Sequence, residues 1–424
     1  MMRRLLSGLL TLTAGCGSNK GASSDGATTV DSAGIAIVTN RTPAWGRGEG
    51  WRVDSVPITS IGANESDTNQ QFRWVMPAVR LTDGSVALAT DGPVKLFGPS
   101  GIFLRNVVRT GMGPGEFRWV SSLHRLSGDT LRISAAGGVG IHAALFAPDG
   151  KLVREERPDM KKFRKLGRWR ECLMEYLPDG SITSCQSDST LPATETNRAE
   201  LPIGEGMMSP GPGLLRQLNR TYLVPPSLDT ALPLSVGAGI EQFGVKLSGS
   251  NMAFIQHAFY SRALLATGGS PMRIATMLNP AYEIAVWTPA GKLDRIIRRT
   301  GGRRPPTGAE VSDARLLITA EVARNQFDAV TAARVAAAVP DPDSLPAGIQ
   351  LRISSEGEII VQRDGLLKSQ SHSHFDIFDS TGRWQGELSL PPRTRLLEVG
   401  KDYLLAVRFD ADDRPVVEVY RLTR

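Results

Sequence analysis

The chain has few residues that could bind a metal ion or act as catalytic bases. Its five histidines are His124, His142, His257, His372 and His374. His372 and His374 are two residues apart, so on a strand both rings would lie on one face, where they could bind zinc. No nearby cysteine or acidic cluster completes a tetrahedral ligand set, and we favour a solvent-exposed pair. The chain also has no Gly-x-Ser-x-Gly turn and no His-Glu-x-x-His helix, so we assign no catalytic residue, metal or cofactor.

A second group of candidates comes from a Phe-Arg-Trp triplet, whose two copies are 45 residues apart. The aromatic rings could simply pack in a core. Arginines are harder to bury, and their planar guanidinium groups bind carboxylates and phosphates well, so Arg73 and Arg118 could hold an acidic ligand. The predicted binding residues are Arg73, Trp74, Glu116, Arg118 and Trp119.

Cys172 and Cys185 could form a disulfide, because they flank the turn sequence Leu177-Pro178-Asp179-Gly180 symmetrically. In a simple hairpin the two cysteines would therefore lie directly opposite each other on neighbouring strands. We predict a disulfide between them, since an exported protein meets oxidising conditions. A bulge at Gly180 would shift the register by one residue and separate the two thiols.

The amino-terminal residues predict export. Two arginines precede a short apolar run, which ends in Leu12-Thr13-Ala14-Gly15-Cys16. This pattern predicts a signal peptide over residues 1–15, and the run is too short for a permanent membrane span. Its end resembles a bacterial lipobox, with Thr13 in place of the usual leucine, and the resemblance implies that Cys16 carries a lipid anchor. The alternative is an ordinary signal peptide that happens to contain a cysteine.

The residues after Cys16 predict how the anchored protein would be placed. Residues 16–32 are rich in Gly, Ser, Ala and Thr, which predicts a flexible tether. Gly17 is not the aspartate that often retains lipoproteins on the inner membrane, so the resemblance favours the outer membrane. The only membrane contact we expect is the lipid anchor.

Composition limits the remaining classes of protein. The 44 glycines and 27 prolines indicate many turns and argue against a mainly helical protein. The formal net charge is +6, but most of the basic residues are single and mixed with acidic ones. A nucleic-acid-binding surface usually concentrates its charge and adds aromatic residues, so we expect no nucleic-acid partner.

Two turn patterns recur along the chain and predict its fold. In the first, an aromatic residue ends a strand and a glycine follows four residues later, at Phe97, Phe146, Trp287 and Phe378. In the second, an acidic residue and a glycine precede a strand, for example at Asp83-Gly84 and Asp179-Gly180. Together they predict antiparallel four-stranded units about 45–50 residues apart, the spacing of β-propeller blades.

The repeats predict an all-β fold, a six-bladed β-propeller. We place the blades near residues 70–108, 118–156, 170–225, 238–300, 347–390 and 394–424. The last blade shows about three strands, so an amino-terminal strand, from residues 34–38 or 51–61, should complete it and close the ring. Ala-rich residues 307–339 predict a helical insert, because Thr307 and Glu310 form a capping box and Pro340 ends the segment.

The segment Gly111-Met112-Gly113-Pro114-Gly115-Glu116-Phe117 predicts a sharp corner between blades. It resembles the Gly-x-Gly-Pro-Gly-Glu-Phe stretch of bacterial six-bladed propeller lipoproteins related to the NHL-repeat propellers. The resemblance covers about residues 33–424 and implies a propeller at the cell envelope, but no particular activity. Phe117 should plug the space between two blades.

The sequence therefore predicts a monomeric, lipid-anchored propeller that binds a small ligand or a protein. Propeller ligands usually bind where loops gather at the mouth of the central channel, so we place the candidate arginine and tryptophan residues there. The alternative is a metal-dependent hydrolase or lyase of the propeller lactonase or NHL lyase type.

Overall fold

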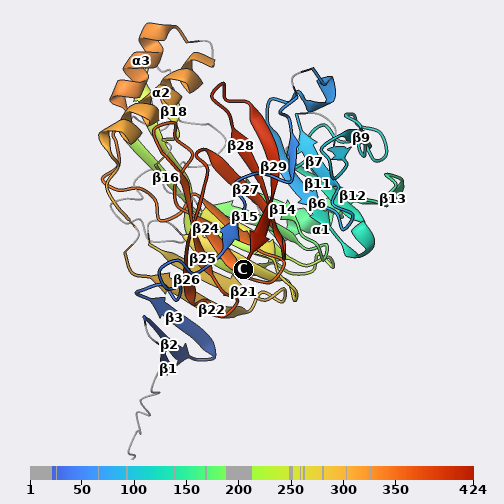
Figure 1. Cartoon of the computed structure of the whole chain (residues 1–424), viewed down its shortest axis with the longest axis horizontal. Helices are drawn as coiled ribbons and strands as arrows, with labels where there is room; N and C mark the ends of the chain where they lie inside the picture. Colours follow the sequence, from blue (N-terminus) through green and yellow to red (C-terminus); the bar gives the residue numbers. More distant parts are fainter. Residues whose placement is uncertain are drawn as a thin grey trace, which may run out of the picture.

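The computed structural model describes residues 22–424 with the exception of 25, 65, 92–93, 138–139, 168–169, 188–212, 248–251, 258, 261–262, 279–280, 302 and 325–326. Within this part of the chain the strands form six sheets, which follow one another in sequence order and are antiparallel except for one parallel pair, β3 with β22 (Figure 1). The predicted signal peptide and Cys16 lie outside the described residues.

The first three sheets take up the chain from residue 75 to residue 255. Sheet one contains β6 (Val75–Arg80), β7 (Val86–Thr90), β8 (Val94–Phe97) and β9 (Phe103–Asn106). Sheet two contains β10 (Ser122–Arg125), β11 (Leu131–Gly137), β12 (Gly140–Phe146) and β13 (Leu152–Glu156). Sheet three contains β14 (Arg170–Tyr176), β15 (Ile182–Ser187), β16 (Gly213–Val224), β17 (Leu232–Lys246) and β18 (Met252–Ile255).

The other three sheets combine carboxyl-terminal strands with amino-terminal ones. Sheet four contains β19 (Ala263–Gly268), β20 (Arg273–Leu278), β21 (Glu283–Trp287) and β22 (Leu293–Arg299), followed by β3 (Ile35–Asn40), β2 (Ala27–Ser32) and β1 (Ala22–Ser24). Sheet five contains β23 (Gln350–Ile353), β24 (Ile359–Gln362), β25 (Ser373–Phe378) and β26 (Trp384–Leu390). Sheet six contains β27 (Thr394–Val399), β28 (Tyr403–Phe409), β29 (Pro415–Thr423), β4 (Arg52–Val53) and β5 (Thr59–Ile61).

The six sheets close into a ring. Each sheet contacts the next one, and β27 and β28 of the last sheet contact β6 of the first. A separate apolar cluster fills the gap between every pair of neighbouring sheets, including the gap between the sixth and the first. Because one antiparallel sheet cannot bury both of its faces alone, this stacking around an axis is what stabilises the fold. The prediction of an all-β propeller is confirmed.

The predicted turn chemistry explains why the strands form hairpins. The glycines that follow the four repeated aromatic residues all have positive φ, between 72° and 86°. Gly101 is one of them, and its N–H donates to the carbonyl of Gly98 at 2.9 Å, which closes the turn. An L-residue is strained in this region of φ, so each glycine fixes the position of its hairpin.

The amino-terminal segment closes the ring, as predicted, through residues 51–61. Thr59–Ile61 pairs with Val417–Val419, and Arg52–Val53 pairs with Leu422–Thr423. Residues 34–38 do not close the ring. Residues 35–38 belong to β3, which lies parallel to β22 in sheet four, with β2 and β1 beyond it. The prediction of a flexible tether over residues 16–32 is wrong for residues 27–32, which form β2.

The β2–β3 hairpin has a turn that its sequence does not signal clearly. Ala33 and Gly34 form a two-residue loop in which both residues have positive φ, 54° and 80°. This is the geometry of a type I′ turn, where asparagine or aspartate usually precedes the glycine. The side chain of Asp31 supports the turn by accepting from the Gly34 N–H at 3.2 Å.

The predicted boundary between the third and fourth blades is also wrong. Residues 238–246 belong to β17 of sheet three, which pairs with β16 over a long hairpin. Residues 252–255 then add β18 as a fifth strand. Sheet four begins only at Ala263. The long hairpin has no acidic-Gly turn, so the repeat pattern could not locate it.

The predicted helical insert lies between sheets four and five and consists of two helices, α2 (Gly308–Arg324) and α3 (Ala329–Ala338). A shorter helix, α1 (Met160–Lys165), connects sheets two and three, and 3-10 turns occur at Thr68–Gln70 and Ser127–Asp129. The insert packs its buried side, which includes Ile318 and Val335, against β17 and β18 (Figure 1). No helix among the described residues is long and apolar enough to cross a membrane.

The register of the β14–β15 hairpin differs from the one that symmetry predicts. Beside the turn Tyr176 pairs with Ile182, which is one residue away from the predicted register. A further shift between Arg170 and Glu175 then places Cys185 opposite Arg170. Cys185 is nevertheless disulfide-bonded. The side chain of Cys172 lies outside the described residues, so Cys172 as the partner stays a prediction.

We expect Cys172 and Cys185 to be protected from alkylation until the exported protein is reduced, because a disulfide has no free thiolate. Mass spectrometry of peptides alkylated before and after reduction measures this directly. Labelling of Cys172 in the unreduced, folded protein would exclude it as the partner of Cys185.

Candidate functional site

Three pockets lie on the face of the ring that carries the connections between sheets. In each sheet the turn between the second and third strands points to the same face as the connection to the next sheet, so both kinds of loop gather there. The pockets have volumes of about 600, 540 and 340 Å³. We name them after one residue each, the Arg393 pocket, the Arg73 pocket and the Trp119 pocket.

The Trp119 pocket brings together three of the five predicted binding residues. It is lined by Glu116, Arg118 and Trp119 from the connection between sheets one and two. His142 on β12 and Arg157 and Met160, which follow β13, complete it. None of these residues lies on the first strand of a sheet, so the pocket lies away from the axis of the ring.

The glycine-rich corner positions this pocket. The Glu116 side chain folds back, and its Oε2 accepts from the Gly113 N–H at 2.9 Å. A Cβ atom on Gly111 would lie 2.0 Å from the same oxygen, so a larger residue there would displace the Glu116 carboxylate. Gly115 has a φ of 69°, and its N–H donates to Glu155 Oε1 at 2.8 Å. Glu116 therefore braces the corner at the edge of the pocket.

Phe117 anchors the corner to the core. Its side chain is 1% exposed and belongs to the apolar cluster between sheets one and two, which confirms the predicted plug. Its ring stacks on His142, with centroids 4.6 Å apart and planes 13° from parallel. The stack holds the His142 imidazole at the pocket wall.

The pocket combines positive charge with an apolar surface. Arg118 is exposed, and Arg157 forms a surface ion pair in which Nη2 lies 3.2 Å from Glu155 Oε2. Burial lowers the pKa of His142, and the nearby Arg157 lowers it further, so the imidazole is neutral near pH 7. The apolar part comes from Met160 and from two side chains that remain well exposed, Met112 at 62% and Trp119 at 39%.

The other two predicted residues do not join this pocket. Arg73 lines the Arg73 pocket, together with Asp91 and Arg414 from other turns on the same face. Trp74 is 51% exposed and lines none of the three pockets. The predicted pairing of Arg73 with Arg118 at one site is therefore not formed, because the two arginines line different pockets.

Sequence reasoning missed the partners of Arg118. His142, Arg157 and Met160 come from the neighbouring hairpin and from the start of α1, 24 to 42 residues further along the chain. These three residues belong to no recognisable motif. Their closeness to Arg118 follows only from the stacking of sheet two beside the corner, which the blade repeat predicts in outline.

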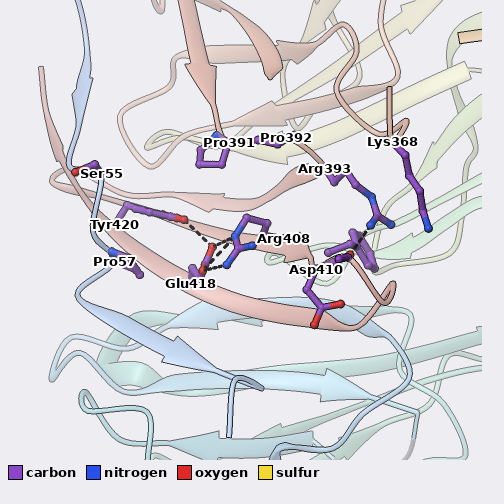
Figure 2. A pocket seen from close by; sticks show the side chains of 12 residues that line it. Ser55, Pro57, Lys368, Pro391, Pro392, Arg393, Arg408, Asp410, Glu418 and Tyr420 are labelled. Carbon is purple, nitrogen blue, oxygen red and sulfur yellow. Dashed lines mark hydrogen bonds and ion pairs between the residues drawn. The ribbon is translucent and has the colours of Figure 1, made fainter. Parts of the chain in front are cut away.

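The Arg393 pocket is the largest of these three, but its charged groups already form ion pairs (Figure 2). Arg408 holds Glu418 through Nη2 and Oε1 at 2.8 Å, and the Tyr420 hydroxyl donates to Glu418 Oε2 at 2.6 Å. Arg393 forms an ion pair with Asp413. These contacts leave little uncompensated charge for a ligand.

In the predicted histidine pair, His372 is exposed and His374 has acidic neighbours. His374 Nδ1 lies 2.7 Å from Asp364 Oδ1, and His374 Nε2 lies 4.0 Å from Glu387 Oε1. The rings of His372 and His374 are 6.4 Å apart. Within the part of the chain that the structure describes, no group of three or more His, Cys, Asp or Glu side chains could hold a metal ion.

Comparisons with known proteins show similarities of fold. No protein-family model matches the chain, and no curated protein matches its sequence. Among solved structures, a Bacteroides fragilis protein thought to be exported is 9% identical with a TM-score of 0.43, covering 92% of this chain and all of its own (100%). A gluconolactonase of Xanthomonas campestris is 11% identical with a TM-score of 0.38, covering 83% of this chain and 87% of its own. Streptogramin B lyase is 12% identical with a TM-score of 0.34, covering 88% of each chain.

Proposed function

We propose that this chain is a non-catalytic binding protein of the cell envelope, which captures a small acidic ligand with an apolar or aromatic part in the Trp119 pocket. The observation that carries the proposal is the convergence of Arg118, Arg157 and the exposed ring of Trp119 on one pocket of about 340 Å³. Guanidinium groups hold oxyanions through paired hydrogen bonds, and an indole ring offers a face for stacking.

The charge balance of the pocket supports an anionic ligand. Arg118 and Arg157 contribute two positive charges, and Glu116 is the one acidic side chain among the lining residues. The Glu116 carboxylate already accepts a hydrogen bond from the Gly113 N–H. The ion pair of Arg157 with Glu155 is exposed, with Arg157 63% exposed, and such pairs contribute little stability. A ligand can therefore engage Arg157 at small cost.

We further propose that the protein is exported and held at the membrane by a lipid on Cys16, on the outer membrane where the cell has one. The support is the lipobox-like end of the apolar run at residues 12–16. A lipid anchor would hold the protein at the membrane, since each buried methylene contributes about 0.8 kcal/mol. Metabolic labelling with a lipid precursor tests this, and a Cys16→Ser variant should lose the label.

The binding proposal is tested with benzenesulfonate, which has a permanent negative charge and an aromatic ring. Titration calorimetry should give one site per chain, and a double variant Arg118→Gln, Arg157→Gln should bind at least tenfold more weakly. Benzenesulfonamide, which has the same shape without the charge, should bind much more weakly to the wild type. Both variant side chains are surface groups, so the melting temperature should change little.

Arg73→Gln is the matched control, because Arg73 is also an exposed arginine of a Phe-Arg-Trp triplet but lines another pocket. It should leave the affinity unchanged. Equal affinities for the wild type and the double variant, or an equal loss in Arg73→Gln, would refute the Trp119 pocket as the site.

The affinity for benzenesulfonate should increase as the pH falls from about 7.5 to 5.5. In the free protein the pKa of His142 is lowered by burial and by Arg157. A bound anion would favour the protonated imidazole and raise this pKa, so the complex takes up a proton that the free protein lacks. The charge of the sulfonate is constant over this range. A His142→Asn variant should bind with little pH dependence, while His374→Asn should behave like the wild type.

A further inference from the structure

The Arg73 pocket has no part in the proposed function, and it lies where the ring closes. Its residues come from the connection between β5 and β6, from the turn after β7 and from the β28–β29 turn, so sheets six and one both contribute to it. Its volume is about 540 Å³. The polar side chains that line it are those of Asn64, Gln70, Gln71, Arg73, Asp91 and Arg414.

Hydrogen bonds and close packing fix one wall of this pocket. The Gly62 N–H donates to Gln70 Oε1 at 2.9 Å, and Gln70 Nε2 donates to Asp67 Oδ2 at 3.2 Å. A Cβ atom on Gly62 would lie 2.8 Å from the carbonyl oxygen of Pro415 and 3.0 Å from the Phe72 ring. Phe72 is buried and belongs to the apolar cluster between sheets six and one. The wall is therefore held in place by the protein itself.

Arg73 and Asp91 are the two charged side chains of the pocket that no other group engages. Both are exposed, and among the described residues neither side chain forms a hydrogen bond or an ion pair. Arg414 differs from them, because it forms ion pairs with Asp410 at 2.9 Å and with Asp412 at 3.3 Å. The pocket therefore offers a ligand one cationic group and one anionic group.

Lys95 does not take the place of a partner for Asp91. Burial lowers the pKa of Lys95, and the charge of Asp91 opposes this shift, so the two charges interact. The Lys95 ammonium group nevertheless donates to the carbonyl of Asn69 at 2.7 Å, and Lys95 does not line the pocket. The Asp91 carboxylate stays available on the pocket side.

The strand register places Arg73 and Asp91 near each other. Val75 of β6 pairs with Thr90 of β7, and Arg73 and Asp91 continue from this pair at the same end of sheet one. Both line one pocket, yet they form no ion pair with each other. A cationic and an anionic group thus lie at one pocket with room between them.

We propose that the Arg73 pocket binds a free α-amino acid as a zwitterion, with its carboxylate on Arg73 and its ammonium group on Asp91. A guanidinium group binds a carboxylate through two parallel hydrogen bonds, and a carboxylate accepts from an ammonium group. In an α-amino acid one carbon atom joins the two charged groups, so one small molecule can reach both side chains. Asn64, whose Oδ1 accepts from the Ser66 N–H at 3.1 Å, adds an amide group that can donate.

The two opposite charges distinguish this pocket from the Trp119 pocket. An anion such as benzenesulfonate is attracted by Arg73 but repelled by Asp91, and for a simple cation the two effects are reversed. Only a ligand with both charges gains from both groups. This proposal does not depend on the proposed function of the Trp119 pocket.

The test is a thermal-shift screen of the wild-type protein with the twenty common L-amino acids, followed by calorimetric titration with the one that stabilises most. We expect saturable binding at one site per chain. Arg73→Gln and Asp91→Asn should each weaken this binding at least tenfold. Both are exposed side chains, so the melting temperature of the free protein should change little.

Two derivatives of the same amino acid assign its charges to the two side chains. The N-acetyl derivative lacks the ammonium charge, so it should bind the wild type more weakly, and Asp91→Asn should not weaken its binding further. The carboxamide derivative lacks the carboxylate, so Arg73→Gln should not weaken its binding further.

Arg118→Gln and Asp402→Asn are the matched controls. Arg118 lines the Trp119 pocket, and Asp402 is an exposed aspartate of the β27–β28 turn that lines none of the three pockets. Both should leave the affinity for the amino acid unchanged, so a failure here is distinct from a failure at the Trp119 pocket. No saturable binding of any of the twenty amino acids, or wild-type affinity in either Arg73→Gln or Asp91→Asn, would overturn the proposal.

Discussion

Replacing Phe117 by Ala should lower the free energy of unfolding by about 3–5 kcal/mol, the range for removing a fully buried aromatic side chain. Phe117 is 1% exposed and fills the cluster between sheets one and two. Its loss would leave a cavity in one of the gaps that hold the ring together, and would remove the stack on His142. Equilibrium unfolding in urea, followed by far-UV circular dichroism, measures the change.

Trp74→Ala is the control for Phe117→Ala, because Trp74 belongs to the other Phe-Arg-Trp triplet but is 51% exposed. We expect a change below about 1 kcal/mol for this surface position. If Phe117→Ala also costs less than about 1 kcal/mol, the packing of sheets one and two does not depend on Phe117. That result would contradict the role of the glycine-rich corner as an anchor between the two sheets.

Replacing Glu310 by Gln should loosen the helical insert and lower the free energy of unfolding by about 1–3 kcal/mol, the range for losing hydrogen bonds to a charged group. Glu310 is 3% exposed and completes the predicted capping box, in which its Oε2 accepts from the Thr307 N–H at 2.8 Å. Arg304 holds both carboxylate oxygens, at 2.6 and 2.7 Å, and Gln370 donates to Oε1 at 2.8 Å. The one side chain therefore ties the start of α2 to sheet five.

The same contacts predict how the insert responds to acid. The hydrogen bonds from Arg304 contribute most to lowering the pKa of Glu310, which is about 2 instead of its ordinary value of 4.5. A lowered pKa means that the carboxylate stabilises the fold fully above pH 4.5, and that this stabilisation is lost as the pH falls towards 2. In Glu310→Gln this pH dependence should be much smaller.

Hydrogen exchange of the α2 amides, measured by mass spectrometry, detects the release of the insert. Glu321→Gln is the control, because Glu321 is an exposed residue of the same helix. Protection of α2 that is equal in Glu310→Gln and Glu321→Gln would show that the insert is held by its apolar side alone.

Several features were predictable because a local sequence rule agrees with the final packing. The turn glycines require positive φ wherever the hairpin occurs, and the capping box needs only Thr307 and Glu310 at their spacing. The closing strand at residues 59–61 followed from the missing fourth strand of the last sheet, because a propeller leaves an unpaired edge there.

Other features depend on contacts that no local rule contains. The Ala33-Gly34 turn uses an alanine at positive φ, so residues 27–32 gave no hairpin signal. The register of β14 and β15 differs from the symmetric one by a residue already beside the turn, where Tyr176 pairs with Ile182, and it shifts again inside the strand. The Trp119 pocket needs His142 and Arg157, which reach Arg118 only when sheet two stacks beside the corner.

The most direct test of the proposed function is a crystal structure of the exported protein soaked in 4-iodobenzenesulfonate, with the iodine located by its anomalous scattering. We predict an iodine peak in the pocket beside Trp119, with the sulfonate oxygens within hydrogen-bonding distance of Arg118 and Arg157. An empty Trp119 pocket, with the compound bound only in the Arg73 or Arg393 pocket, would contradict the proposal.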